Sequence, residues 1–90
     1  MFIHLGGDVV VPTKEVIAIL DYKTKDAAAT REFLEIAGDE GFIKNISPRG
    51  KEKSYIITTK NIYISPISCV TLRNRADKFF EQFDERDDSL

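Results

Sequence analysis

Residues 55–65 read YIITTKNIYIS, and this stretch decides the fold class. Tyr, Ile and Thr are enriched in β-strands, and they form two short runs here, over 55–58 and 62–65. Only Thr59, Lys60 and Asn61 separate the runs, and so short a connection can join only antiparallel neighbours. The stretch is therefore predicted to be a β-hairpin.

A second hairpin is predicted at the N-terminus, where β-rich runs over 2–5 and 9–11 flank Gly6-Gly7-Asp8. Glycine supplies the positive φ that a tight turn requires. The β-branched run over 16–20 is interpreted as a third strand, although a helix capped near Thr13 is the alternative. A short strand over 42–46 and a polar loop over 47–53 precede the hairpin at 55–65.

Two helices complete the prediction. Asp26 is expected to cap the first, which ends near Gly38 or Gly41. One face of that helix gathers four apolar residues, namely Ala29, Phe33, Ile36 and Ala37. A C-terminal amphipathic helix follows Pro66, with apolar residues at helical spacing at Leu72, Ala76, Phe79, Phe80 and Phe83. The predicted fold class is α+β: a small antiparallel β-sheet built from two hairpins plus extra strands, one central helix and one C-terminal helix.

The length of 90 residues corresponds to one domain, which we assign to residues 1–80. Residues 81–90 carry five acids and one Arg, so we expect an acidic, disordered tail. No apolar stretch is long enough to span a bilayer, the N-terminus lacks signal-peptide features, and Cys69 is the only cysteine. The expected location is the cytoplasm, with no membrane partner.

The strands are apolar on both faces, whereas an antiparallel sheet in a small monomer normally alternates apolar and polar residues. Two helices of about three turns each can cover one face, so the other face predicts a second copy of the chain as its cover. The alternative is that the C-terminal helix wraps the second face. A homo-oligomer is the expectation.

Candidate catalytic residues are isolated. His4 is the only histidine, with Asp8 alone across the turn, and Cys69 has no partner histidine nearby in sequence. Gly6-Gly7-Asp8 matches no phosphate-binding glycine motif, and nothing assembles a nucleophile, a base and an oxyanion donor. We therefore expect no enzyme, no cofactor, no metal site and no small-molecule substrate.

The best functional signal is a basic segment over residues 44–60, where Glu52 is the single acid. Its five cations are Lys44, Arg49, Lys51, Lys53 and Lys60. Pro48 and Gly50 favour an exposed loop, so the segment predicts a phosphate-binding surface. In the simpler reading it is only a solvated loop. An oligomer would repeat the loop and raise its effective concentration.

Three segments, over residues 2–10, 16–21 and 62–68, together resemble the RemA/RemB family of bacterial biofilm-matrix regulators, and the similarity extends over about residues 1–76. The resemblance implies a LytTR-like fold and a ring that binds double-stranded DNA along a basic rim. It assigns the phosphate contacts to Arg49, Lys51, Lys53 and Lys14. Glu15 stands where the family pattern has an arginine, with Lys14 beside it. The stretch that corresponds to the adjacent arginines of the family is Arg49-Gly50-Lys51-Glu52-Lys53.

Two functions follow as hypotheses. The first is a ring-forming transcriptional regulator of biofilm matrix genes that binds DNA through repeated basic loops. The alternative is a homo-oligomeric regulatory scaffold that acts through a protein partner, such as a paralogous subunit, with little or no DNA binding. Glu15, Glu52 and the acidic tail favour this alternative.

Overall fold

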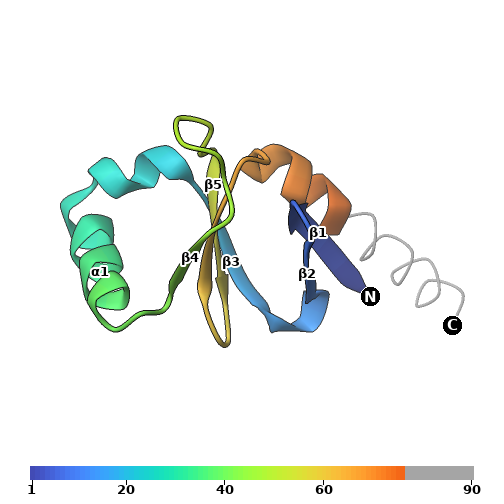
Figure 1. The fold of residues 1–90 in the computed structure, drawn as a ribbon, viewed down its shortest axis with the longest axis horizontal. Helices are drawn as coiled ribbons and strands as arrows, with labels where there is room; N and C mark the ends of the chain where they lie inside the picture. The colour runs from blue at the N-terminus through green and yellow to red at the C-terminus, as the bar shows by residue number, and fades with distance from the viewer. Residues whose placement is uncertain (77–90) are drawn as a thin grey trace, which may run out of the picture.

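The computed structural model describes residues 1–76, which form two sheets and the helices that pack on them (Figure 1). The α+β class is confirmed, and so are both hairpins and the third strand. Residues 69–76 are helical, as predicted for the segment after Pro66. In chain order the elements are β1 (Phe2–Gly6), β2 (Val9–Pro12), the 3-10 helix η1 (Thr13–Glu15), β3 (Val16–Asp21), the 3-10 helix η2 (Tyr22–Asp26), α1 (Ala28–Asp39), β4 (Ile43–Asn45), β5 (Ser54–Thr58) and β6 (Ile62–Ser65).

The larger sheet has the strand order β3-β5-β6-β4, and β1 pairs with β2 in a separate two-stranded sheet. Strand β5 is antiparallel to both β3 and β6, whereas β4 is parallel to β6. The prediction of a single antiparallel sheet is therefore wrong in two respects: the strands form two sheets, and β4 is parallel to its neighbour. Since β4 and β5 lie on opposite sides of β6, the loop between them has to cross the end of the sheet.

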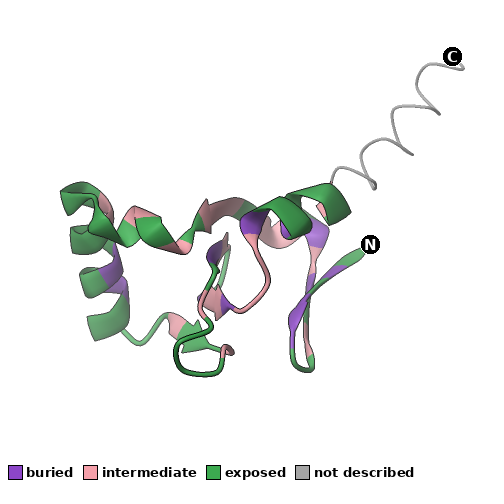
Figure 2. Ribbon diagram, turned by 90° about the horizontal axis from the view of Figure 1, so that it is seen from above, coloured by how far each residue is buried: buried purple, intermediate pink, exposed green. Residues whose placement is uncertain are grey.

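The two faces of the larger sheet are covered by different parts of the same chain. Ile56 packs against the β1–β2 hairpin and Leu72 of the helical segment, in a cluster that also contains Leu5. On the other face, Tyr55 packs with Leu34 of α1. Apolar residues on both faces thus reflect a three-layer arrangement within one copy, as Figure 2 also shows, and not a face left for a second copy.

The β1–β2 hairpin is attached to the larger sheet by buried polar contacts. The Ser65 hydroxyl is fully buried; it donates to the Leu5 carbonyl and accepts from the Ile67 amide, 3.0 Å away. Gly6 has φ +123°, and a Cβ built on it would lie 3.1 Å from Cδ of Pro66. Glycine at this position therefore allows both the turn and the close approach of the hairpin to the sheet.

Helix α1 differs from its prediction at its start and on its apolar face. It begins at Ala28 with Ala27 as an N-cap that makes no side-chain hydrogen bond, so the predicted Asp26 cap is wrong. Leu34 and Ala37 are buried against the sheet, whereas Phe33 and Ile36 are 49% and 58% exposed. The helix rests on a narrow stripe and leaves two large apolar side chains in solvent.

Several predictions for the C-terminus lie outside the described residues. They concern Phe79, Phe80 and Phe83 of the terminal helix, the domain boundary at residue 80, and the tail over 81–90.

Candidate nucleic-acid interface

The loop over residues 46–53 crosses the end of the larger sheet, and its backbone is held in a defined shape. The Lys51 amide donates to the Pro48 carbonyl over 3.0 Å, and Gly50 has φ +82°. This is the geometry of a type II turn with glycine at its third position. Arg49 and Lys51 occupy its second and fourth positions, and both side chains are exposed.

Lys53 lies where the loop joins the sheet. Its amide donates to the Ser65 carbonyl over 2.9 Å, and its own carbonyl accepts from the Tyr22 amide over 3.0 Å. The structure thus brings Arg49, Lys51 and the exposed Lys53 together at one end of the sheet, as the sequence predicted for one continuous loop.

The bond from Tyr22 also fixes η2 beside the loop, which adds Lys23 and Lys25 to the same end of the molecule. Both side chains are exposed, and the Lys25 ammonium lies 4.3 Å from the centroid of the Tyr22 ring. We call the set Lys23, Lys25, Arg49, Lys51 and Lys53 the basic end.

The two η2 lysines were missed from the sequence. Their place beside the loop depends on the antiparallel pairing of β3 with β5, which no local signal in the sequence specifies.

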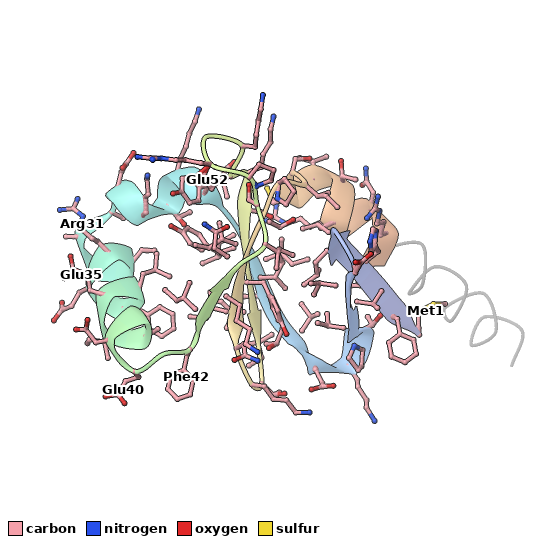
Figure 3. All side chains as sticks on the ribbon, viewed as in Figure 1. Met1, Arg31, Glu35, Glu40, Phe42 and Glu52 are labelled. Atoms are coloured by element: carbon pink, nitrogen blue, oxygen red, sulfur yellow. The ribbon has the colours of Figure 1, made fainter. Side chains whose placement is uncertain are left out.

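Two of the three acids at the basic end, Glu52 and Asp21, are engaged locally, and Asp26 is the third. Hydrogen bonds from the backbone amides of Glu52 itself and of Gly50, together with the charge of Lys25, hold the pKa of the Glu52 carboxyl below its usual value. Asp21 accepts from the Lys23 amide over 2.9 Å and so caps η2. Within residues 1–76, no cation of the basic end forms a salt bridge. These exposed side chains are therefore available to an external anion; nitrogen-tipped side chains project from the end of the sheet where Glu52 is labelled (Figure 3).

Lys14 does not join this set. It belongs to η1, which precedes β3, whereas the basic end lies beyond the last residue of β3. Val16 pairs with Thr58 at one end of the sheet and Asp21 pairs with Ser54 at the other, and five strand steps separate them by about 17 Å. Lys60 lies at the Lys14 end too, 3.5 Å from the Glu15 carboxylate. The predicted contact residues thus lie at two opposite ends of the sheet.

The other candidate residues have structural surroundings. The Nε2 of His4 donates to the Gly7 carbonyl over 2.7 Å within the hairpin turn, and Cys69 is a buried free thiol. No group of three His, Cys, Asp or Glu side chains among the described residues is arranged to hold a metal ion. No helix in the described part of the chain is long and apolar enough to cross a membrane.

Two comparisons give the family of this small mixed fold. The family model described as "RemA-like: Extracellular matrix regulatory protein A-like" matches residues 2–76. Extracellular matrix regulatory protein B of Bacillus subtilis (strain 168) is 38% identical over 81 residues, which cover 90% of this chain and 96% of that protein. The chain belongs to the RemA-like family.

Proposed function

We propose that this chain is a cytoplasmic transcriptional regulator of extracellular-matrix genes that assembles into a ring and binds double-stranded DNA through its basic ends. The relative named as an extracellular matrix regulatory protein supports the regulatory role. The observation that carries DNA binding is the pinned turn that presents Arg49 and Lys51, with Lys53 beside it, to solvent without a salt bridge in the described chain.

One subunit offers too few contacts for useful affinity. If the three loop cations, Arg49, Lys51 and Lys53, each neutralise one phosphate, log K falls with log salt at a slope of about −2.7. Affinity then falls about 40-fold between 50 and 200 mM salt. Two linked subunits double the slope, and their local concentration makes the second contact nearly intramolecular. Assembly is therefore part of the proposed mechanism.

Lys14 has a different role from the loop in this proposal. Because it lies about 17 Å away along β3, it reaches other phosphates than those held by the loop of the same subunit. Its loss should weaken DNA binding by one phosphate contact per subunit and leave the contribution of the loop intact.

The test is fluorescence anisotropy of a labelled A·T-rich duplex at several salt concentrations. Arg49→Ala should weaken binding at least tenfold at 100 mM salt and make the salt slope shallower by about 0.9 for each subunit in contact. Lys44→Ala is the matched control, because this lysine is exposed on edge strand β4 and belongs neither to the basic end nor to the lining of the groove between α1 and the β5–β6 turn. The DNA affinity of this control variant should stay within twofold of that of the parent protein. Absence of binding by the parent protein at 50 mM salt would end the proposal.

The second candidate function is a homo-oligomeric scaffold that acts through a protein partner. It is favoured by Glu15, whose carboxylate contacts both Lys60 and the Thr59 hydroxyl and so neutralises a cation near Lys14. A partner that co-purifies after nuclease treatment, and equally with the parent protein and Arg49→Ala, would select this function.

A further inference from the structure

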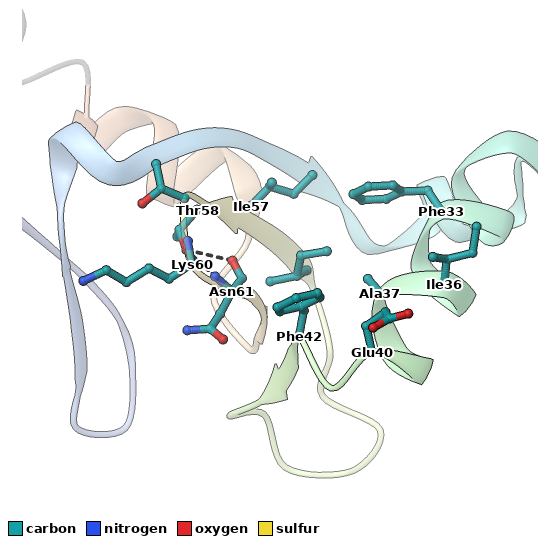
Figure 4. Close-up of a pocket in the computed structure, with 11 residues that line it drawn as sticks. Phe33, Ile36, Ala37, Glu40, Phe42, Ile57, Thr58, Lys60 and Asn61 are labelled. Carbon is teal, nitrogen blue, oxygen red and sulfur yellow. Dashed lines mark hydrogen bonds between the residues drawn. The ribbon is translucent and has the colours of Figure 1, made fainter.

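An apolar groove of about 350 Å³ lies between α1 and the β5–β6 turn (Figure 4). Phe33 and Ile36 enter it from α1, and Phe42 enters from the segment before β4. Phe33 is 49% exposed, Ile36 58% and Phe42 50%. Three large, adjacent, half-exposed apolar side chains are typical of an interaction surface rather than of isolated surface residues.

The outer face of the β1–β2 hairpin is a second exposed apolar surface. Ile3, Leu5 and Val11 point into the core, so the alternating residues of both strands point outward. Phe2 and Val10 are 66% and 54% exposed on that outer face. Phe2 lies opposite Pro12, and Val10 lies opposite His4.

These two surfaces lie at opposite ends of the molecule, with the larger sheet between them (Figures 1 and 2). Their surroundings also carry opposite charge. The segment 28–40, which contains α1 and Glu40 of the groove, has four acids and one Arg, and Lys60 lines the groove from the β5–β6 turn, so the side-chain charge around the groove is −2. The hairpin, η1 and the helical segment, over 1–15 and 69–76, contain Lys14, Arg73 and Arg75 against Asp8 and Glu15, a charge of +1 with His4 neutral.

Charge selects between the two ways in which copies could join. Contact between two grooves would bring two acidic surroundings together, and contact between two hairpins would bring two basic ones together. Contact between a groove and a hairpin pairs opposite charges, which favours encounter and excludes the other orientations. The exposed aromatic area also matches: about 130 Å² of Phe2 against about 100 Å² from each of Phe33 and Phe42.

We propose that the groove of one copy binds the outer face of the β1–β2 hairpin of the next copy, with Phe2 seated among Phe33, Ile36 and Phe42. This proposal rests on the self-association that is part of the proposed function, and it names the contact. The contact is heterologous, because each copy donates a hairpin and accepts another. Repetition closes a ring in which every copy presents its basic end on the same side.

Two substitutions separate the two halves of the contact. Phe33→Asp disables the groove and Phe2→Asp disables the hairpin face. The two side chains are 49% and 66% exposed, so the fold should survive both substitutions. Each variant alone should be a monomer at 10 μM by native mass spectrometry, with self-association weakened more than 30-fold. An equimolar mixture should give one new species, a 1:1 dimer joined by the intact groove of one variant and the intact hairpin of the other.

Other results would overturn the proposal. A Phe2→Asp variant that dimerises alone would show groove-to-groove contact, and a mixture that stays monomeric would show that the two surfaces do not bind each other. A monomeric parent protein would also overturn it. The control is Ile17→Asp, since Ile17 is 66% exposed on edge strand β3, between the two ends. The Ile17→Asp variant should form an assembly of the same number of copies as the parent protein. If Ile17→Asp were monomeric while Phe33→Asp and Phe2→Asp still assembled, the contact would lie at the sheet edge instead.

The same experiment keeps the two proposals distinct. If the mixture forms the 1:1 dimer but the parent assembly fails to bind DNA, the contact stands and the DNA-binding function does not.

Discussion

Substitution of Ser65 by alanine should loosen the β1–β2 hairpin from the larger sheet. The Ser65 side chain is fully buried, and its hydroxyl serves both the Leu5 carbonyl and the Ile67 amide. Alanine removes both bonds and leaves a buried acceptor and a partly buried donor without a partner. Each such group costs about 1–3 kcal/mol, so we expect a loss of about 2–4 kcal/mol in the free energy of unfolding.

The comparison variant is Ser54→Ala. Ser54 is also fully buried and lies opposite Ser65 on the neighbouring strand, but its hydroxyl makes one bond, to the Ile67 carbonyl over 2.7 Å. Its loss should cost about 1–2 kcal/mol. Urea unfolding followed by circular dichroism measures both values, and thermal melting should show a drop of about 10–20 °C for Ser65→Ala. A Ser65→Ala protein within 0.5 kcal/mol of the parent, or less affected than Ser54→Ala, would refute this reasoning.

Two further predictions concern the hairpin turn and alkaline pH. Gly6→Ala should cost about 2–4 kcal/mol, because φ +123° is strained for alanine and the new Cβ meets Pro66, whereas Gly7→Ala, at φ +54° with open space around it, should cost only about 1–2 kcal/mol. Equal losses in urea unfolding would contradict this assignment. Burial raises the pKa of Tyr55 to about 12, so the folded protein resists its ionisation. The contribution of Tyr55 to the free energy of unfolding is complete below pH 10 and should fall by about 1–2 kcal/mol between pH 10 and 12. In Tyr55→Phe the free energy of unfolding should fall less over this pH range, and an equal fall would exclude Tyr55 as its cause.

The hairpins could be predicted from the sequence because their signals are local. β-branched and aromatic runs, interrupted by glycine or by short polar turns, specify antiparallel neighbours without any knowledge of the rest of the chain. The direction of β4 could not be predicted in this way. It has three residues, and its pairing with β6 depends on a loop that crosses the end of the sheet.

The covering of the sheet was misjudged for a related reason. Apolar residues on both faces of β3 and β5 correctly indicated two buried faces, but the sequence does not show that the β1–β2 hairpin folds back as the second cover. The large apolar side chains that the covering leaves exposed include Phe33 and Ile36 instead. Helical periodicity placed them with Ala37 on one apolar face, and the geometry of packing decided that only part of that face is buried.

The basic loop was found because its cations lie within five residues of one another in the chain, and the structure adds Lys23 and Lys25 to it. The position of Lys14 could not be inferred, since it depends on which end of β3 lies beside the loop. Resemblance to the family assigned phosphate contacts to four residues. The strand register places Lys14 at one end of the sheet and Arg49, Lys51 and Lys53 at the other.

Native mass spectrometry of the parent protein, with and without a short duplex, tests the central claim most directly. The account predicts a single closed assembly of several copies in the absence of DNA, and the same assembly with one duplex bound at low salt. A monomer, or an assembly that takes up no DNA at low salt, would contradict it.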